Sequence, residues 1–228
     1  MNINDFKEIG ITYDPLKDDR LELIFNRQQE MMSKYHEIEA KNGLLITPDV
    51  PVNLHDSKGQ LRLKDFAWRI TEELGEALEA FHIHPDHPEH FDEEISDALH
   101  FLVEFTILAG YSADQIANRY IDKYDRMDWI YQEANKPWRI GTTRHYPTVV
   151  SRVGYFVEAL AMTCNTLKNK PWKQSQMMTD TYFFEINLGE AWLRFIRICL
   201  SANISSDQLF ILYFKKSQVN QFRQRSNY

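Results

Sequence analysis

The sequence of 228 residues predicts an all-α protein, and three observations support this prediction. Apolar residues recur at helical spacing in seven stretches of the chain. Proline, glycine and asparagine occur at the breaks between these stretches, as they do at turns. No segment alternates polar and apolar residues for long enough to predict a strand.

The predicted helices are bounded by these breaks. The first three helices end before the breaks at Thr47–Gly59, Pro85–Pro88 and Gly110. The fourth ends before Pro137–Pro147 and the fifth before Asn169–Pro171. The third helix is apolar on nearly all sides, which predicts that it is buried. In order, the predicted helices are 20–40, 62–81, 93–109, 113–134, 148–167, 180–201 and 206–225.

Length and composition predict one globular domain over residues 1–228, since 43% hydrophobic residues suffice for a full core. Its first half would cover about 20–135 and its second half about 145–228. The net charge of −7 argues against nucleic-acid binding as a main activity.

The cysteines and the N-terminus predict a cytoplasmic protein without a membrane segment. Cys164 and Cys199 both lie in apolar helical stretches, which does not resemble a disulfide framework and fits a reducing compartment. Residues 1–19 are polar and acidic, unlike a signal peptide, and no apolar run approaches the length that spans a bilayer.

Two acidic pairs with the same spacing are the main functional signal. They are Glu73-Leu74-Gly75-Glu76 and Glu94-Ile95-Ser96-Asp97. A spacing of three places both carboxylates of a pair on one side of a helix, about one turn apart. Two such helices side by side would gather four carboxylates, which repel one another without a cation. All-oxygen clusters suit Mg²⁺, so the pairs predict a metal site that acts on a phosphate ester or anhydride.

Acidic residues also occur on helices for reasons unrelated to metals. Near a helix N-terminus they complement the helix dipole, and Asp92 would serve as N-cap of the helix 93–109. The paired arrangement favours the metal site, because Glu73 borders the apolar stripe whereas Glu72 and Glu79 lie on the solvated side. Carboxylates at the start of a buried helix also need a partner.

A weak internal repeat relates the two halves. Residues 91–102 align without gaps on residues 182–193, and the turn and helix start after each copy are similar. Two carboxylates of the second copy, Glu158 and Glu185, align with Glu76 and Glu94, and the other two positions hold Tyr155 and Leu188. The repeat predicts that one half holds the metals and that the other has been freed for a different task.

The last predicted helix suggests that task. Lys216, Asn220 and Arg223 stand at i, i+4 and i+7, so one helical face presents an ammonium, an amide and a guanidinium. All three donate hydrogen bonds, as a polyphosphate clamp requires. An amphipathic helix with a solvated basic face is the alternative, and the acidic cluster in the same chain favours the clamp.

The two acidic pairs resemble the motif of the all-α NTP pyrophosphatase superfamily, which includes the MazG proteins. The signature of its dimeric dUTPase and phage dCTPase-dUTPase branch is similar to Tyr213-x2-Lys216-x3-Asn220-x2-Arg223-Gln224-x3-Tyr228. The resemblance runs from about residue 22 to the end. It implies a helical bundle built from two degenerate MazG-like halves. It also implies hydrolysis of a deoxynucleoside triphosphate to the monophosphate and pyrophosphate by a homodimer, for which the aromatic-rich stretch 124–131 is a candidate subunit contact.

The resemblance also implies roles for particular residues. Two or three Mg²⁺ ions would be held by Glu73, Glu76, Glu94 and Asp97. Glu73, nearest the packed side, is our candidate for the catalytic carboxylate that orients the attacking water and accepts its proton. The β- and γ-phosphates would be held by Lys216, Asn220, Arg223 and Tyr228. The nucleotide itself would contact Gln28, His100 and Gln224, although a core role for His100 is equally compatible with the sequence.

One stretch departs from similar dUTPases, which carry Trp and Lys residues there. Residues 82–90 instead contain four histidines in nine positions. Pro85 and Pro88 interrupt helical ligand spacing, so a polar loop is favoured over a zinc site.

Three functional hypotheses follow from the sequence. The first is a pyrophosphatase that prefers dUTP, and the second is the same reaction on dCTP or on a broader set of nucleotides. Gln28 offers both a donor and an acceptor, so it does not choose between uracil and cytosine. The third is a nucleotide-binding regulatory protein without turnover, which the complete acidic set disfavours. A generic helical scaffold is the remaining alternative.

Overall fold

The computed structural model describes residues 11, 13–14, 17–117, 126–136, 144–170, 172, 174–175 and 177–226. These ranges contain helices and no strand, which confirms the all-α prediction. The helices are α2 (Arg20–Lys41), α3 (Ser57–Ile83), α4 (Pro88–Leu108), α5 (Ala113–Ile116), α6 (Arg126–Asn135), α7 (Tyr146–Asn165), α8 (Thr181–Ser201) and α9 (Ser206–Arg225).

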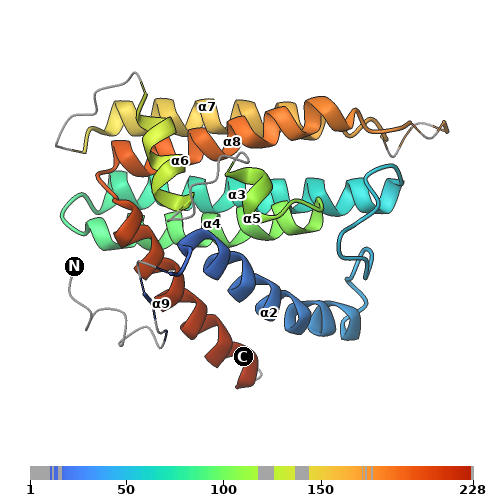
Figure 1. Ribbon diagram of the computed structural model, residues 1–228, viewed down its shortest axis with the longest axis horizontal. Coiled ribbons are helices and arrows are strands. Elements are labelled where there is room, and N and C mark those ends of the chain that lie inside the picture. The colour runs from blue at the N-terminus through green and yellow to red at the C-terminus, as the bar shows by residue number, and fades with distance from the viewer. Residues whose placement is uncertain are drawn as a thin grey trace.

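Two long antiparallel hairpins make up most of the bundle (Figure 1). In the view of Figure 1, α7 and α8 form the upper hairpin, and α3 and α4 form the hairpin beneath it. Helices α2 and α9 pack below α4 and against each other, so α4 is covered on several sides. This agrees with its apolar sequence, because a helix that is apolar all round needs partners all round.

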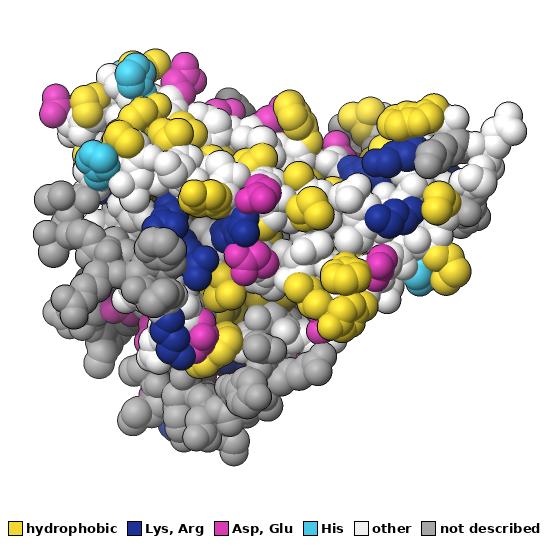
Figure 2. Space-filling model, turned by 90° about the horizontal axis from the view of Figure 1, so that it is seen from above, with side chains coloured by type: hydrophobic (Ala, Val, Ile, Leu, Met, Phe, Trp, Pro, Cys, Tyr) yellow, Lys and Arg dark blue, Asp and Glu magenta, His cyan; other side chains and the backbone are white. Residues whose placement is uncertain are grey.

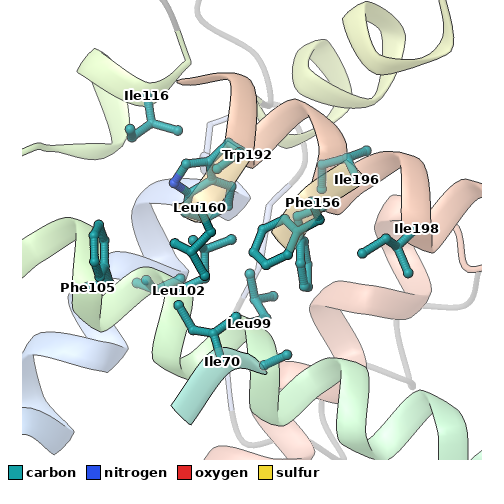
Figure 3. Packing of buried hydrophobic residues seen from close by; sticks show 14 of the residues in the cluster. Ile70, Leu99, Leu102, Phe105, Ile116, Phe156, Leu160, Trp192, Ile196 and Ile198 are labelled. Carbon is teal, nitrogen blue, oxygen red and sulfur yellow. The ribbon is translucent and has the colours of Figure 1, made fainter. Parts of the chain in front are cut away.

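The hydrophobic core lies between the two hairpins (Figure 3). Ile70 of α3 and Leu99 and Leu102 of α4 face Phe156 of α7 and Trp192 of α8, and all five side chains are buried. The Trp192 ring also needs a hydrogen-bond acceptor, and its Nε1 donates to Thr106 Oγ1 of α4 at 3.0 Å. The core thus fixes the α3–α4 hairpin against the rest of the bundle.

Capping residues explain where several helices begin. Asp56 accepts hydrogen bonds from the backbone of Lys58 and Gly59, so α3 starts at Ser57, before the predicted residue 62. Helix α4 starts at Pro88 and not at residue 93, because proline is well suited to the first helical position. The prediction of Asp92 as N-cap is therefore wrong.

Asp92 lies inside α4, where its carboxylate accepts a hydrogen bond from Arg144 Nη2 at 2.6 Å.

Helix 113–134 was predicted as one segment, but the described residues show α5 ending at Ile116 and α6 beginning at Arg126. Residues 118–125 lie outside the described part.

The two copies of the internal repeat end in turns of the same geometry. Gly110 has φ +87° and Asn203 has φ +58°, a left-handed backbone that Gly and Asn adopt at low cost. Ser112 and Ser205 then begin α5 and α9 with identical capping boxes. The matching turns support the predicted relation between the halves, and a common origin from a MazG-like unit stays a prediction.

The described part of the stretch 124–131 is not an exposed surface. Met127, Ile130 and Tyr131 are buried, and α6 packs against α8. The expectation that this stretch is exposed is therefore wrong for these three residues, whose side chains cover the chain's own core, whereas Trp129 is half-buried and a subunit contact stays a prediction. Tyr124 lies outside the described residues.

Taken singly, no helix in the described ranges has the length and apolar composition needed to cross a membrane. Helices α8 and α9 meet that test only as a pair, and the pair is bent by 100°.

Candidate functional site

The acidic pairs lie opposite each other in the α3–α4 hairpin. Glu73 and Glu76 project from α3, and Glu94 and Asp97 project from the first turns of α4. Oxygen atoms of Glu73, Glu76 and Glu94 all lie within 4.8 Å of one another. The structure thus brings together three of the four predicted metal ligands.

The fourth, Asp97, lies at the edge of this trio and has a different partner. Its Oδ2 accepts a hydrogen bond from Lys216 Nζ of α9 at 2.5 Å. Both side chains are largely shielded from solvent, so the ion pair is stronger than a surface pair. Lys216 therefore links the acidic cluster of the hairpin to the basic face of α9.

A pocket of about 280 Å³ opens beside the carboxylates, between α2, α3, α4 and α9. Acidic, basic and aromatic side chains share its wall, so it can accept a charged ligand that carries a planar ring. The lining residues are Gln28, Met31, Tyr35, Glu39, Arg69, Glu73, Asp97, His100, Phe101, Glu104, Lys216, Asn220 and Arg223.

Burial and mutual repulsion make the cluster hold protons more tightly than free carboxyl groups do. Burial, together with the charges of Asp97, Glu76 and Glu94, raises the pKa of Glu73 to about 8. Burial also raises the pKa of Glu94 and of Asp97, and the Lys216 ammonium opposes both increases. A divalent cation would relieve this repulsion.

We expect the metal-free protein to lose thermal stability as pH rises from about 4.5 to about 8. In this range folded Glu73, with a pKa of about 8, keeps a proton that the unfolded chain, with a pKa of 4.5, has released. The folded state therefore binds more protons, and the free energy of unfolding falls with rising pH. In chelator, the melting temperature of wild type should fall relative to that of Glu73→Gln across this range. A constant difference between the two proteins would contradict the expectation.

The carboxylates fit a hard divalent cation in chemistry and in arrangement. Neighbouring oxygen ligands of an octahedral Mg²⁺ lie about 2.9 Å apart when each bond is about 2.0–2.1 Å long. Small rotations of Glu73, Glu76 and Glu94 bring oxygens that are already within 4.8 Å to such separations. Asp97 would join them if Lys216 turned toward a ligand.

The predicted phosphate-binding face of α9 points into the same pocket. Lys216, Asn220 and Arg223 all line it, together with Glu73 and Asp97. This placement follows from their spacing, because i, i+4 and i+7 share one side of a helix. Tyr228, the fourth predicted phosphate contact, lies outside the described residues.

The inner end of the pocket is a buried hydrogen-bond network centred on Gln28. The Tyr213 hydroxyl donates to Gln28 Oε1 at 2.7 Å, and His100 Nδ1 lies 2.9 Å from the same oxygen. Gln28 Nε2 donates to Glu104 Oε2 at 2.8 Å. Gln28, which is only 2% exposed, is thus held in one orientation, and its amide nitrogen keeps a second N–H for a ligand.

His100 combines a core position with an open nitrogen. Burial lowers its pKa to about 3, so the imidazole is neutral near pH 7, and its ring stacks on Tyr213 at a centroid distance of 3.9 Å. Within the described ranges, its buried Nε2 has no hydrogen-bond partner. Both interpretations of His100 from the sequence are therefore compatible with its surroundings.

Gln224 is placed differently from the other predicted nucleotide contacts. It is absent from the pocket wall, and its Nε2 donates to the carbonyl of Met31 at 3.4 Å. Its visible role is to join α9 to α2, so a nucleotide contact by Gln224 stays a prediction.

Several pocket residues were missed by the sequence reasoning. Arg69 precedes Glu73 by one helical turn, and Glu104 follows Asp97 by two, so both share a helix face with a predicted ligand. That spacing was an available signal for both. Tyr35 and Glu39 of α2 follow the predicted contact Gln28 by seven and eleven residues, so the same spacing placed them on its helix face as well.

The described residues of the second half do not repeat the acidic cluster. Glu158 Oε2 accepts a hydrogen bond from Arg194 Nη1 at 2.9 Å, and Arg194 Nε donates to Glu190 at 2.6 Å. Glu185 precedes Arg194 by nine residues, which is about 13 Å along α8. The alignment of Glu158 and Glu185 with Glu76 and Glu94 is therefore not matched in space. The two pairs were matched in separate segments of the sequence, which does not specify how α7 and α8 align across their longer connection.

Comparison with known proteins gives one positive result. A family model described as dUTPase matches residues 70–228, which is more than half of the chain. The match includes both acidic pairs and the basic face of α9, and it begins after α2. No curated protein and no solved structure matches the sequence. On the extent of the family match, this chain belongs to the dUTPase family of nucleotide hydrolases.

Proposed function

We propose that this protein hydrolyses dUTP to dUMP and pyrophosphate in a Mg²⁺-dependent reaction. The observation that carries the proposal is the meeting of opposite charges at one pocket. Glu73 of α3 and Asp97 of α4 line the same pocket as Lys216, Asn220 and Arg223 of α9. A metal–triphosphate complex needs this combination, with oxygen ligands for the cations and donors for the phosphates.

The carboxylates and the donors of α9 have distinct tasks in this proposal. Glu73, Glu76, Glu94 and Asp97 would hold two or three Mg²⁺ ions, which neutralise phosphate charge and acidify a water molecule when bound. Glu73 orients that water and accepts its proton, since it belongs to the carboxylate trio and also lines the pocket.

The basic face of α9 serves the leaving group. When the anhydride bridge between the α- and β-phosphates breaks, negative charge accumulates on the departing pyrophosphate. Lys216 and Arg223 stabilise that charge, and the Asn220 amide adds a donor without charge. In the free protein the Lys216 ammonium is paired with Asp97, so an arriving phosphate would exchange one anionic partner for another.

A substrate panel tests the proposal directly. Pyrophosphate release is measured from dUTP, dCTP, dTTP, dATP and dGTP with Mg²⁺, and with chelator as control. We expect dUTP to give the highest kcat/KM and chelator to abolish release. Nucleotide binding without release from any substrate would overturn the proposal and favour a nucleotide-binding regulatory protein.

A second candidate is the same reaction on dCTP. The inner end of the pocket carries the Glu104 carboxylate, which is 4% exposed, and the open Nε2 of His100. Both are hydrogen-bond acceptors when His100 Nδ1 holds the ring proton. Cytosine offers its amino group to such acceptors, whereas uracil presents carbonyl oxygens on both sides of its single N–H. A higher kcat/KM for dCTP than for dUTP in the same panel would establish this alternative.

The remaining parts of the proposal concern relatives and setting. We place the chain with the MazG-like all-α pyrophosphatases on the basis of its acidic pairs. A cytoplasmic location fits Cys164 and Cys199, which are both free thiols. We also propose a homodimer, supported by large exposed aromatic side chains such as Trp172 and Tyr182, which are 77% and 70% exposed. The mass of the protein in solution tests the dimer.

A further inference from the structure

The turn between α3 and α4 arranges three histidines at regular intervals. His84 follows the last residue of α3, His87 precedes the first residue of α4, and His90 lies in the first turn of α4. The backbone N–H of His87 donates to the carbonyl of His84 at 2.9 Å, and the N–H of His90 donates to that of His87 at 3.2 Å. The chain thus makes two consecutive turns with i to i+3 hydrogen bonds.

Turns of this kind bring the imidazoles together. The ring centroid of His90 lies 5.9 Å from that of His84 and 5.8 Å from that of His87. Glu89 completes the group, because its Oε1 lies 2.8 Å from His87 Nδ1.

We propose that this turn binds a divalent transition-metal ion of the Zn²⁺ class through His84, His87, Glu89 and His90. Ligand atoms of His87, Glu89 and His90 already lie within 4.8 Å of one another. A tetrahedral zinc site with bonds of about 2.0–2.1 Å needs ligand separations of about 3.3–3.5 Å. All four side chains are exposed, so no packing opposes the rotations that close this difference.

The chemistry of this site differs from that of the carboxylate cluster. Imidazole nitrogens suit zinc, copper and nickel, whereas clusters made only of carboxylates suit magnesium. The two sites share no ligand: along α3, Ile83 lies seven residues beyond Glu76, about 10 Å, and along α4 His90 precedes Glu94 by one helical turn. Excess Mg²⁺ can therefore occupy the carboxylates while a transition metal is added to the histidines.

Zinc at this position would tie together the two helices that carry the metal-binding carboxylates. His84 extends from the end of α3 and His90 belongs to α4, so one ion would join both sides of the hairpin. In Figure 2, histidine and acidic side chains are exposed near one another at the left end, where α3 turns into α4 in Figure 1. The ion would stabilise the hairpin without entering the nucleotide pocket.

The structure also explains why the sequence disfavoured this site. Pro85 and Pro88 do interrupt the i, i+4 spacing of ligands on a continuous helix. They do so by ending α3 and starting α4, and the turn between the two helices brings the ring of His90 near those of His84 and His87.

Zinc titration of matched histidine variants tests the proposal. The full chain is stripped with chelator and transferred to buffer with excess Mg²⁺, and Zn²⁺ is then titrated calorimetrically. The comparison uses wild type, the double variant His87→Ala/His90→Ala and the control His82→Ala, whose ring instead packs on Tyr146. We expect one saturable Zn²⁺ per chain and a higher melting temperature with Zn²⁺ for wild type and the control. The double variant should lose both effects.

Two results would overturn the proposal, namely no Zn²⁺ binding by wild type and unchanged binding by the double variant. Co²⁺ gives a second readout, since its visible absorption reports nitrogen ligation in a tetrahedral site. Circular dichroism confirms that the double variant is folded. The test does not depend on the proposed function, because its readout is metal binding and not nucleotide hydrolysis.

Discussion

Replacing Glu73 by glutamine is expected to lower the turnover of the nucleotide substrate by about 100- to 10,000-fold, the usual contribution of a general base. Glutamine has the same shape as glutamate but accepts no proton from water. Of the clustered carboxylates, Glu73 belongs to the trio within 4.8 Å and also lines the pocket. The measurement is kcat for pyrophosphate release at saturating Mg²⁺, with the best substrate of the panel.

Glu79→Gln is the matched control for this result. Glu79 lies on the same helix, is exposed and belongs neither to the carboxylate trio nor to the pocket wall, so its substitution removes the same charge without removing a predicted ligand. We expect Glu79→Gln to retain wild-type turnover and both variants to bind nucleotide. Equal turnover in Glu73→Gln and wild type would exclude Glu73 as the base and direct attention to Glu76, Glu94 and Asp97.

The second large effect is expected for Lys216→Ala. Loss of one preorganised charged donor to a developing phosphate charge lowers kcat by about 100- to 1,000-fold. Lys216 is the residue of α9 that contacts the acidic cluster directly, through its 2.5 Å contact with Asp97. The measurement is kcat and KM for the same substrate, because a contact made chiefly in the transition state affects kcat more than KM.

Lys215→Ala controls for the loss of positive charge. Lys215 is the preceding residue of the same helix, and its side chain is exposed outside the pocket. Wild-type kinetics for Lys215→Ala together with a large loss for Lys216→Ala would support the clamp. If both variants behaved like wild type, Lys216 would serve only to neutralise Asp97 in the free protein.

The fold was largely predictable because helix formation leaves local signals. The stripe formed by Ile70, Leu74 and Ala77 is buried as predicted, and Glu72 and Glu79 are exposed. Helix starts were less predictable, since α4 begins five residues before the predicted position. Proline was interpreted only as a break, although it also favours the first turn of a helix.

The candidate site was predictable where its residues share one helix and less so where it depends on contacts between helices. Spacing alone indicated that Lys216, Asn220 and Arg223 share a face, and the structure places them together. The network of Gln28, Tyr213 and Glu104 joins three helices, and no local pattern specifies such a meeting. The pairing of Glu158 with Glu76 failed for the same reason, because the register between α7 and α8 depends on tertiary packing.

The two hairpins differ in what balances the negative charge of their carboxylates. In α7–α8 the cation that balances Glu158 and Glu190 is Arg194, a permanent part of the chain, so this hairpin needs no divalent cation to balance them. In α3–α4 Lys216 pairs with Asp97, and the trio of Glu73, Glu76 and Glu94 is the part that a divalent cation from outside would balance. The equilibrium between closed and locally opened forms is therefore coupled to divalent-cation concentration in one hairpin and independent of it in the other. Backbone amides of α3 and α4 would report cellular magnesium, while those of α7 and α8 would not.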